Sequence, residues 1–527
     1  MAKKTKAPAP RKQNPAAFDI ILNNPDIIQQ LMAALGGHAE AAPGLAEQLK
    51  DYLALYTQPE ALEDGDQEMS GRAADLQSLL TDLRVEVNSG DRAAREELEE
   101  GLAIIEAAAE AGDLPGHAIV ALFQIFGMAE VDPGDALREA LLARLEDVGE
   151  PGAPAPPGRT KSAGDLSVLD EETSQAMFAA MMRYMPKSAR HNLVSNVGGE
   201  AQDTAQAILM GCLLDSDPDL VRIAAEGLIA SARSTPVPSR LVERLVLIRG
   251  LAPAPMHPAV DAAIAALRPK ASAPVAREPL QLVKCVASIC DGAGAQSLIA
   301  LMRRGKTHVM VTFMVKTHSG LADAMVLDGF SKREFDQIVK GGMGIDVMPV
   351  SLEVIQRRLS IALSVSHAKG TPATFGFVQA LEALGIAALR PEAVDPEALL
   401  DEFLAENTPL VPVTLAEAAG RLDDAGLAET WFEAGPDCDK RLDRLRGVKQ
   451  RYKAALGYIE ERRGFWAAQC ANSALILRGS GKPLGPHWYD FAILGKHFAS
   501  REPLAENPLA GLMAEGTVEA HQGQMYR

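Results

Sequence analysis

A stretch rich in proline, alanine and glycine, residues 149–165, divides the chain and limits what it can fold into. Proline lacks a backbone N–H, and alanine and glycine bury little apolar surface, so this composition is typical of a linker. We therefore expect separately folded units on its two sides. A second segment of similar composition, residues 269–279, predicts a shorter joint within the later part of the chain.

The charge of the chain changes at the same place. The whole sequence of 527 residues has a formal net charge of −18. Residues 13–150 hold 28 acidic side chains against 7 basic ones, whereas residues 1–12 hold five basic side chains and no acidic one. The remainder is nearly neutral. The acidic excess thus marks a domain boundary near residue 150, and the overall charge does not exclude local contact with phosphates.

Helical patterns account for most of the sequence. Residues 1–13 form a basic tail for which we expect no fixed structure, and residues 14–148 predict an acidic domain of short helices. Its first helix begins at Asn24, because Pro25 and Asp26 are typical of a helix N-terminus. The following helices are expected near residues 44–56, 71–88, 92–111, 116–128 and 133–147. Residues 346–527 predict a C-terminal helical domain.

Helix pairs recur after the linker, over residues 166–268. Residues 205–214 and 219–232 predict two apolar helices joined by a short turn. The run Asp217-Pro-Asp-Leu-Val-Arg222 at this turn, with Ala224, Ala225 and Leu228 behind it, resembles a HEAT repeat unit, in which an Asp-Pro turn starts the second helix. The resemblance covers about residues 205–232 and extends more weakly to residue 267. It implies that neighbouring helix pairs stack to close one core.

Residues 280–345 are expected to hold the strands and one further helix. Four apolar runs separated by turn residues predict an antiparallel meander, at residues 280–290, 295–303, 308–317 and 321–327. Ser331 and Glu334 predict a capping box that opens a helix ending at Gly341-Gly342. The fold class that follows is mainly α, a helical bundle plus a HEAT-like array, with a small antiparallel β-meander inserted.

Residues 291–297 (DGAGAQS) invite comparison with a dinucleotide-binding glycine loop. Such a loop needs a GxGxxG turn and an acidic residue after the next strand. Ser297 occupies the last glycine position, and the strand that ends near His318 has no acid at its end. A hairpin turn is the better interpretation, while a crossover helix over residues 295–304 stays open. No cofactor is predicted.

Polar side chains gather at the turns and strand ends of the same region. Histidine and carboxylate groups can act as acids and bases or bind a metal, but their spacing here matches no recognised ligand pattern. Solvated turn residues are the more ordinary interpretation. An enzyme, for example a hydrolase, with a site at this β element remains an alternative, and its candidate catalytic residues are Asp291, His318 and Asp323.

Near the C-terminus, His487, Asp490 and His497 have a spacing that would allow a metal site on one helix face. The structural interpretation is simpler, because neighbouring aromatic side chains would anchor the helix in a core. Asp490 would then cap the helix or pair with a base such as Arg462 or Arg463. We therefore predict no metal.

Residues 440–463 hold the strongest basic run, and apolar residues at helical spacing give it a buried face. With the basic tail, this helix could lie on the phosphates of a nucleic acid, which is a second alternative function. The aromatic content of 5% and the lack of a binding motif favour instead a solvated face or a dock for the acidic domain. The candidate contacts are Lys440, Arg444, Lys449, Arg451 and Lys453.

The favoured function is a cytoplasmic scaffold or adaptor that binds another macromolecule, in the first place a protein, through helical surfaces. No hydrolase, P-loop, kinase or zinc-finger signature is present, so no catalytic activity is evident. Residues 114–129 are the longest stretch without a charged residue and are too short to span a membrane. An odd number of cysteines without a CxxC pair favours reduced thiols: Cys212, Cys285, Cys290, Cys438 and Cys470.

Overall fold

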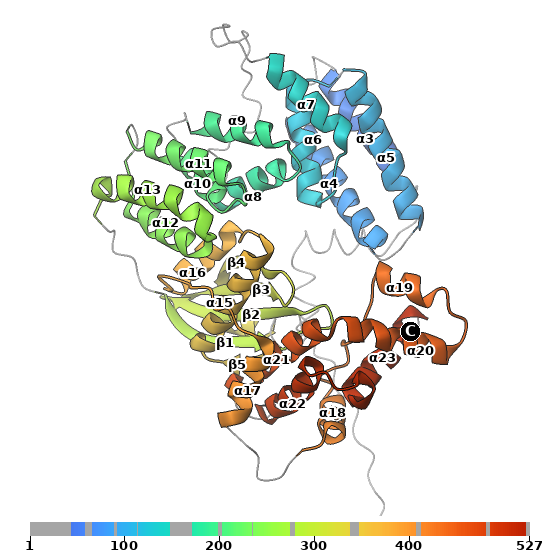
Figure 1. The fold of residues 1–527 in the computed structure, drawn as a ribbon. Helices are drawn as coiled ribbons and strands as arrows, with labels where there is room; N and C mark the ends of the chain where they lie inside the picture. The colour runs from blue at the N-terminus through green and yellow to red at the C-terminus, as the bar shows by residue number, and fades with distance from the viewer. Residues whose placement is uncertain are drawn as a thin grey trace, which may run out of the picture.

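The computed structural model describes residues 44–57, 66–88, 92–112, 114–147, 171–198, 203–233, 236–273, 280–337, 347–406, 413–480 and 485–522. These residues form a mainly α-helical fold with a small five-stranded antiparallel sheet (Figure 1). The predicted fold class of helices with a local β-meander is therefore confirmed. The basic tail, the helix expected at Asn24 and the linker at residues 149–165 lie outside the described residues.

The N-terminal helices form a bundle with its own apolar core. Leu49, Leu80, Ile105, Phe123 and Phe126 are fully enclosed in this core. Each of the five helices expected between residues 44 and 147 is present with bounds within two residues of the prediction, except that α4 begins five residues earlier than predicted. The helices are α3 (Leu45–Thr57), α4 (Asp66–Asn88), α5 (Arg92–Glu110), α6 (Gly116–Ala129) and α7 (Asp135–Asp147).

The next helices pack as pairs in two layers. Helix α8 packs on α10 in one layer, while α9, α11 and α13 follow one another in the second layer. Helices α10 and α11, and helices α12 and α13, connect the layers as pairs. The bounds are α8 (Glu171–Met182), α9 (Lys187–Val197), α10 (Asp203–Cys212), α11 (Pro218–Ser231), α12 (Ser239–Leu251) and α13 (His257–Leu267).

Asp217 starts helix α11 and also connects it to α9. Its carboxylate accepts a hydrogen bond from the backbone N–H of Asp219 (3.1 Å), and Pro218 occupies the first helical turn. His191 Nε2 and Lys187 Nζ of α9 lie 2.7 Å and 3.2 Å from its oxygens. Burial opposes ionisation of this carboxylate, but the hydrogen bonds from His191 and Lys187 outweigh it and lower the pKa of Asp217 to about 2.

We expect Asp217→Asn to destabilise the protein by about 1–2 kcal/mol at pH 7, because asparagine keeps the cap but loses the charge-assisted bonds to α9. Because the pKa of Asp217 is lower in the folded protein than in the unfolded chain, the ionised carboxylate stabilises the fold at pH values above its unfolded-chain pKa. This contribution is lost as the pH falls through about 2. Urea unfolding followed by circular dichroism should therefore give a lower free energy of unfolding for the variant than for the wild type at pH 7, and similar values for the two near pH 2. The exposed Asp219→Asn should change stability by less than about 0.5 kcal/mol. A difference for Asp217→Asn that does not vary with pH would contradict this account.

The strands form one sheet in the order β4-β3-β2-β1-β5, with every neighbouring pair antiparallel. The four predicted strands are present, and the segment after Asp291 is a strand, so the crossover helix considered for residues 295–304 is wrong. Leu298–Met302 is a continuous apolar run that is buried on both faces of the sheet, and such a short run bounded by turn residues fits a buried strand. The bounds are β1 (Gln281–Ser288), β2 (Ala295–Arg304), β3 (Thr307–Lys316), β4 (Gly320–Phe330) and β5 (Val347–Val350).

The capping box opens a short helix after β4, as predicted. The Ser331 backbone N–H donates to Glu334, and the Glu334 N–H donates to the Ser331 hydroxyl, at the start of α14 (Lys332–Gln337). The helix end expected at Gly341-Gly342 lies outside the described residues. Strand β5 was not predicted, because a four-residue strand that contains Pro349 carries no periodic signal.

Helices from the C-terminal part cover the sheet and extend beyond it. Helices α15 and α16 pack on β4, and α21 contacts β1, β5 and α22 (Figure 1). Their bounds are α15 (Leu352–Lys369), α16 (Phe375–Ala383), α17 (Pro396–Glu406), α18 (Leu415–Asp424), α19 (Pro436–Leu442), α20 (Val448–Glu461), α21 (Arg463–Ser480), α22 (Trp488–Ala499) and α23 (Pro508–His521). Short 3-10 helices lie at Ala254–Met256, Arg268–Lys270, Gly485–His487 and Leu504–Glu506.

One continuous core joins the helix pairs, the sheet and the C-terminal helices. Leu228 of α11, Phe313 of β3 and Trp466 of α21 all belong to it. Residues on both sides of the joint expected at 269–279 therefore share one apolar interior. Within the described part of the chain, no helix is both long enough and apolar enough to cross a membrane.

Candidate functional site

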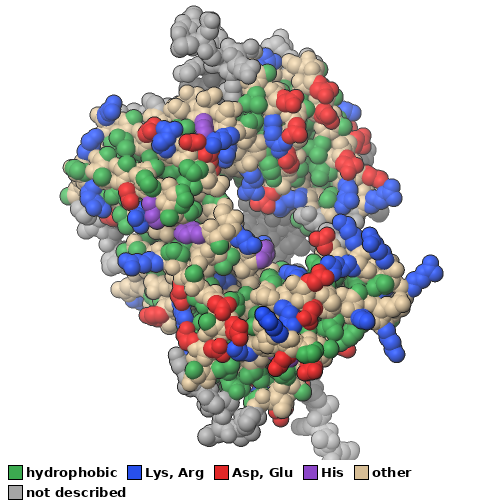
Figure 2. Space-filling view, in the orientation of Figure 1, with side chains coloured by type: hydrophobic (Ala, Val, Ile, Leu, Met, Phe, Trp, Pro, Cys, Tyr) green, Lys and Arg blue, Asp and Glu red, His purple; other side chains and the backbone are tan. Residues whose placement is uncertain are grey.

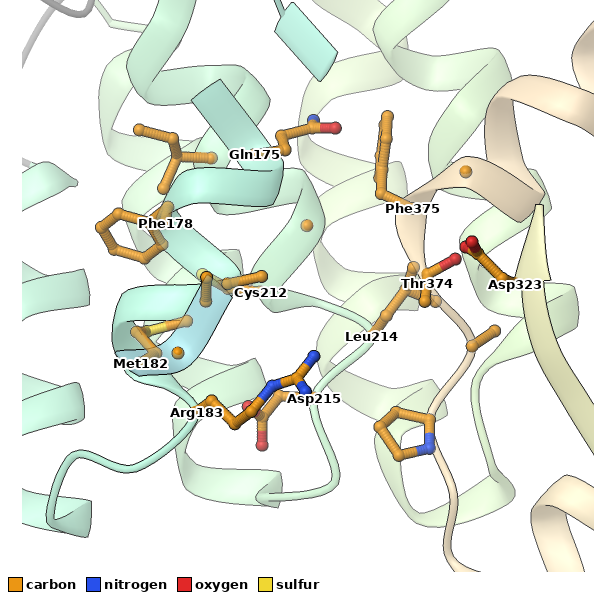
Figure 3. Close-up of a pocket in the computed structure, with 18 of the residues that line it drawn as sticks. Gln175, Phe178, Met182, Arg183, Cys212, Leu214, Asp215, Asp323, Thr374 and Phe375 are labelled. Carbon is orange, nitrogen blue, oxygen red and sulfur yellow. The ribbon is translucent and has the colours of Figure 1, made fainter. Parts of the chain in front are cut away.

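A cavity of about 500 Å³ lies where the N-terminal helices, the helix pairs and the sheet meet. In Figure 3, Phe178, Met182 and Cys212 form one side of it, and Phe375 and Asp323 lie on the opposite side. Its walls come from the end of α6, from α8 and α10, from β4 and from the segment that leads into α16. A mostly apolar cavity of this size is typical of a binding site.

Two glycines allow these walls to approach one another. A Cβ atom at Gly127 of α6 would lie 1.9 Å from the carbonyl oxygen of Ala180 in α8. A Cβ atom at Gly376 of α16 would lie 2.0 Å from the carbonyl oxygen of Ala324 in β4. Only glycine fits at such backbone-to-backbone contacts. The shape of the cavity thus depends on two close packings between parts of the chain that are remote in sequence.

Charged side chains line one part of the cavity. Arg183 lies 2.7 Å from Glu130, and this hydrogen bond lowers the pKa of the Glu130 carboxyl despite its partial burial. Arg190 pairs with Asp215 at 3.2 Å. Asp323 on β4 accepts a hydrogen bond from the backbone N–H of Ala324 (2.8 Å) and remains exposed. Among the described residues Asp323 has no cationic partner, so it can receive a donor from a bound molecule.

Exposed apolar side chains continue the surface beyond the cavity. Met128 of α6 and Met325 of β4 line the cavity and are 38% and 45% exposed. Leu327 lies two residues after Met325 and therefore on the same face of β4, and Met314 of β3 is paired with Asp323. Methionine side chains are flexible and adapt to different apolar partners. The cavity and this face together form an extended apolar surface.

The cysteine in the cavity wall is not an activated nucleophile. Burial raises the pKa of the Cys212 thiol far above its ordinary value, so the thiol is protonated at neutral pH. The nearby Gln175 amide donates to the carbonyl oxygen of Ala207 (2.7 Å) and is held in place. The wall thus favours binding through shape and apolar contact.

Asp291 and His318 lie at the same end of the sheet, in the β1–β2 turn and the β3–β4 turn. The two turns are joined, because the backbone N–H of Thr317 donates to the carbonyl oxygen of Gly294 (2.8 Å). The Asp291 carboxylate accepts the N–H of Ala295 (2.8 Å) and thereby closes its own turn. Asp323, the third candidate for the enzyme alternative, lies apart from them in the cavity wall.

His318 stands in a cationic environment. Its ring lies 6.3 Å from the ring of Phe465, measured between centroids. Burial and the positive charges of Lys316, Arg462 and Lys369 lower the pKa of His318. The ring is therefore neutral at pH 7, and Asp291 is engaged in its turn, so the geometry here is that of two ordinary hairpin turns.

The three candidate metal ligands, His487, Asp490 and His497, are not brought together. His487 Nδ1 lies 3.1 Å from an oxygen of the buried Asp490, but His497 instead lies 3.3 Å from Glu502. Asp490 pairs with Arg421 of α18, so the expected pairing with Arg462 or Arg463 is wrong. Tertiary packing selects Arg421, because α18 and α22 lie side by side. In the described segments, no group of three or more His, Cys, Asp or Glu side chains is placed to hold a metal ion.

The predicted basic contacts divide into two kinds. Lys440 faces Asp437 at 3.8 Å, and the Arg451 guanidinium donates to the carbonyl oxygen of Leu445 (2.9 Å). The remaining predicted contacts are exposed, and they are Arg444, Lys449 and Lys453.

Sequence reasoning missed the cavity because its wall combines distant segments. Phe178 and Phe375 are almost two hundred residues apart and belong to different predicted domains. The sequence feature that could have indicated the cavity is the methionine-rich helix α8, whose Met182 lines it.

Two segments of the chain are similar to domains described for one protein family. A model of the Y4lR second domain matches residues 186–271, and a model of the Y4lR C-terminal helical domain matches residues 397–522. The uncharacterized protein y4lR of Sinorhizobium fredii (strain NBRC 101917 / NGR234) is 28% identical over 254 residues, which are 45% of this chain and 47% of that protein. The chain thus spans about half the length of this curated relative. No solved structure matches.

Proposed function

We propose that this protein is a cytoplasmic helical-repeat scaffold that binds an extended segment of a partner protein. The cavity between α6, α8, β4 and α16 would receive an apolar anchor side chain of that segment. The observation that carries the proposal is the continuity between the cavity and the exposed apolar face of β3 and β4. The two-layered stacking of α8 to α13 is also the arrangement that HEAT-like repeats would adopt.

A peptide segment fits this surface better than a small molecule. A small ligand in the cavity would leave Met314 and Leu327, which are 44% and 37% exposed, in contact with water. An extended chain covers both the cavity and this face, because alternate side chains of a strand point to the same side. Asp323 would lie beside such a chain and favour a basic residue next to the apolar anchor.

The enzyme alternative receives less support from the geometry. Asp291 is engaged in a backbone turn, His318 is neutral at pH 7 and packs near Phe465, and Cys212 is protonated. The cytoplasmic location is part of the proposal and is supported by the five cysteines, which are all free and buried.

Filling the cavity should weaken partner binding. Ala179 of α8 is exposed and lines the cavity, so Ala179→Trp would occupy the space without disturbing a buried core. The matched control is Ala230→Trp, on an exposed position of α11 away from the cavity. A photo-crosslinking amino acid at position 179 would identify the bound segment, and a synthetic peptide of that segment would then be titrated against each variant.

We expect Ala179→Trp to weaken peptide binding at least about tenfold, equivalent to about 1.4 kcal/mol, and Ala230→Trp to leave it unchanged. Met325→Lys should weaken binding as well, because it places a charge on the apolar face and repels a basic segment. If all three variants bind the peptide as the wild type does, the cavity is not the binding site.

A further inference from the structure

Unpaired cations gather at the junction of α19 and α20. Residues 444–459 contain five basic side chains and no acidic one. Arg444 and Arg446 lie in the segment between the two helices, and Lys449 and Lys453 lie one turn apart on α20. These four side chains, hereafter the basic surface, are all exposed. Figure 2 shows Lys and Arg side chains projecting at the right of the molecule, where Figure 1 places α19 and α20.

The basic surface differs from the cations around it, which have partners. Arg441 pairs with Glu461 at 2.7 Å, and Arg463 pairs with Glu460 at 2.6 Å. Arg462 pairs with the buried Glu433. Within the part of the chain that the structure describes, none of the four side chains of the basic surface has an ion-pair partner. Their charge is therefore available to a molecule outside the chain.

The position of Lys449 adds to this availability. Helix α20 begins at Val448 without a side-chain cap and without an acidic residue in its first turn. A cation at this end of a helix is opposed by the partial positive charge of the backbone N–H groups. The same N–H groups and cations would stabilise an anion placed against them. These positive charges thus repel one another in the free chain and would be stabilised by a bound anion.

We propose that the basic surface binds the phosphate backbone of a double-stranded nucleic acid, without sequence preference. Arginine and lysine contacts to phosphates supply this kind of binding, which needs no apolar core. Val448, which is 64% exposed, is the one exposed apolar side chain within residues 444–453, whereas a protein interface needs an apolar centre. Tyr452 and Tyr458, the two aromatic residues of helix α20, are both half-buried, so neither offers a fully exposed ring on which bases of a single strand could stack.

The proposal concerns a surface that is separate from the cavity and does not depend on the proposed peptide binding. It also revises the set of contacts expected from the sequence. Arg446 enters the set because it is exposed and unpaired among the described residues, while Lys440 and Arg451 leave it because each has a partner of its own.

The test is a salt titration of the full-length protein with a fluorescein-labelled DNA duplex of mixed sequence, followed by fluorescence anisotropy. Each phosphate contact lowers the slope of log K against log salt concentration by about 0.9. The test variant combines Arg444→Gln, Arg446→Gln, Lys449→Gln and Lys453→Gln. The control variant combines Lys306→Gln, Lys332→Gln, Arg333→Gln and Arg501→Gln, which removes the same charge from other exposed positions without ion pairs among the described residues.

We expect the wild type and the control variant to bind the duplex at low salt with similar affinity. The test variant should bind at least about tenfold more weakly, with a slope shallower by about 3 to 4, because each phosphate contact carries about 0.9. Circular dichroism would verify that both variants are folded. The proposal would be overturned if the wild type did not bind the duplex at low salt, or if the test and control variants lost duplex affinity equally. Displacement of the duplex by polyglutamate at equal charge concentration would also overturn it and indicate an acidic protein partner.

Discussion

Gly127→Ala is expected to destabilise the protein by about 3 kcal/mol, although alanine is the better helix former. Gly127 lies in the last turn of α6, against α8, and a methyl group there would lie 1.9 Å from the carbonyl oxygen of Ala180. Since that neighbour is backbone, no side chain can rotate away, and the two helices must separate. Separation would expose apolar contacts between α6 and α8, which are among the most extensive between helices of the described chain.

The same substitution would also alter the cavity, because Gly127 and Met128 form part of its wall. We therefore expect weaker binding of the partner peptide together with the loss of stability. Urea unfolding monitored by circular dichroism measures the stability, and limited proteolysis reports whether the N-terminal helices detach. Gly116→Ala is the matched control in the same helix, because no atom lies within 4 Å of its Cβ position. Equal stability of the two variants would show that α6 and α8 are not in the close contact described.

Glu433→Ala is expected to destabilise the C-terminal helices by about 3–5 kcal/mol. The buried Glu433 carboxylate accepts a hydrogen bond from Trp466 Nε1–H (2.8 Å) and pairs with Arg462. Its backbone N–H donates to the hydroxyl of Thr517 (2.9 Å), which connects the segment to α23. Truncation would leave a buried indole N–H and a partly buried guanidinium without their acceptor.

Glu433→Gln should cost less than Glu433→Ala, because the amide oxygen can still accept the bond from Trp466 while only the charge is lost. Burial raises the pKa of Glu433 even though Arg462 and Trp466 oppose this effect. Because the pKa of Glu433 is higher in the folded protein than in the unfolded chain, the free energy of unfolding decreases as the pH rises from the unfolded-chain pKa through the folded-state pKa. This decrease in stability should therefore be absent in Glu433→Gln.

Tryptophan fluorescence during urea unfolding measures both effects, since the rings of Trp466 and Trp431 lie 5.7 Å apart in this core. The exposed Glu461, which pairs with Arg441, provides a control, and Glu461→Ala should change stability by less than about 0.5 kcal/mol. An unchanged urea midpoint for Glu433→Ala would contradict the role assigned to this carboxylate.

The secondary structure was largely predictable, because its signals are local. Helix bounds, the Asp217 cap and the Ser331–Glu334 capping box follow from residues a few positions apart. The four longer strands follow from apolar runs bounded by turn residues. Strand β5 was missed because Val347–Val350 is too short to show a period, and it pairs with β1, about sixty residues earlier.

The candidate site was predictable only in fragments. The sequence indicates Asp323 as a candidate carboxylate of the β element, and in the structure it lines the cavity together with Phe375, without Asp291 or His318. The sequence suggests Arg462 or Arg463, at the junction of α20 and α21, as partners of Asp490, whereas the structure provides Arg421 of α18. No sequence pattern predicts which of several arginines will pair with a given carboxylate.

By itself, the sequence determined where most helices and the four longer strands lie and which residue types each presents, because hydrogen bonding and side-chain periodicity within an element depend on near neighbours. It also placed an acidic excess in residues 13–150 and a group of cations in residues 440–463. Only the tertiary structure decided which of those cations are neutralised by partners, and where α6, α8, β4 and α16 leave a cavity. Both outcomes depend on distances between residues remote in sequence, and these distances are set by how apolar faces pack.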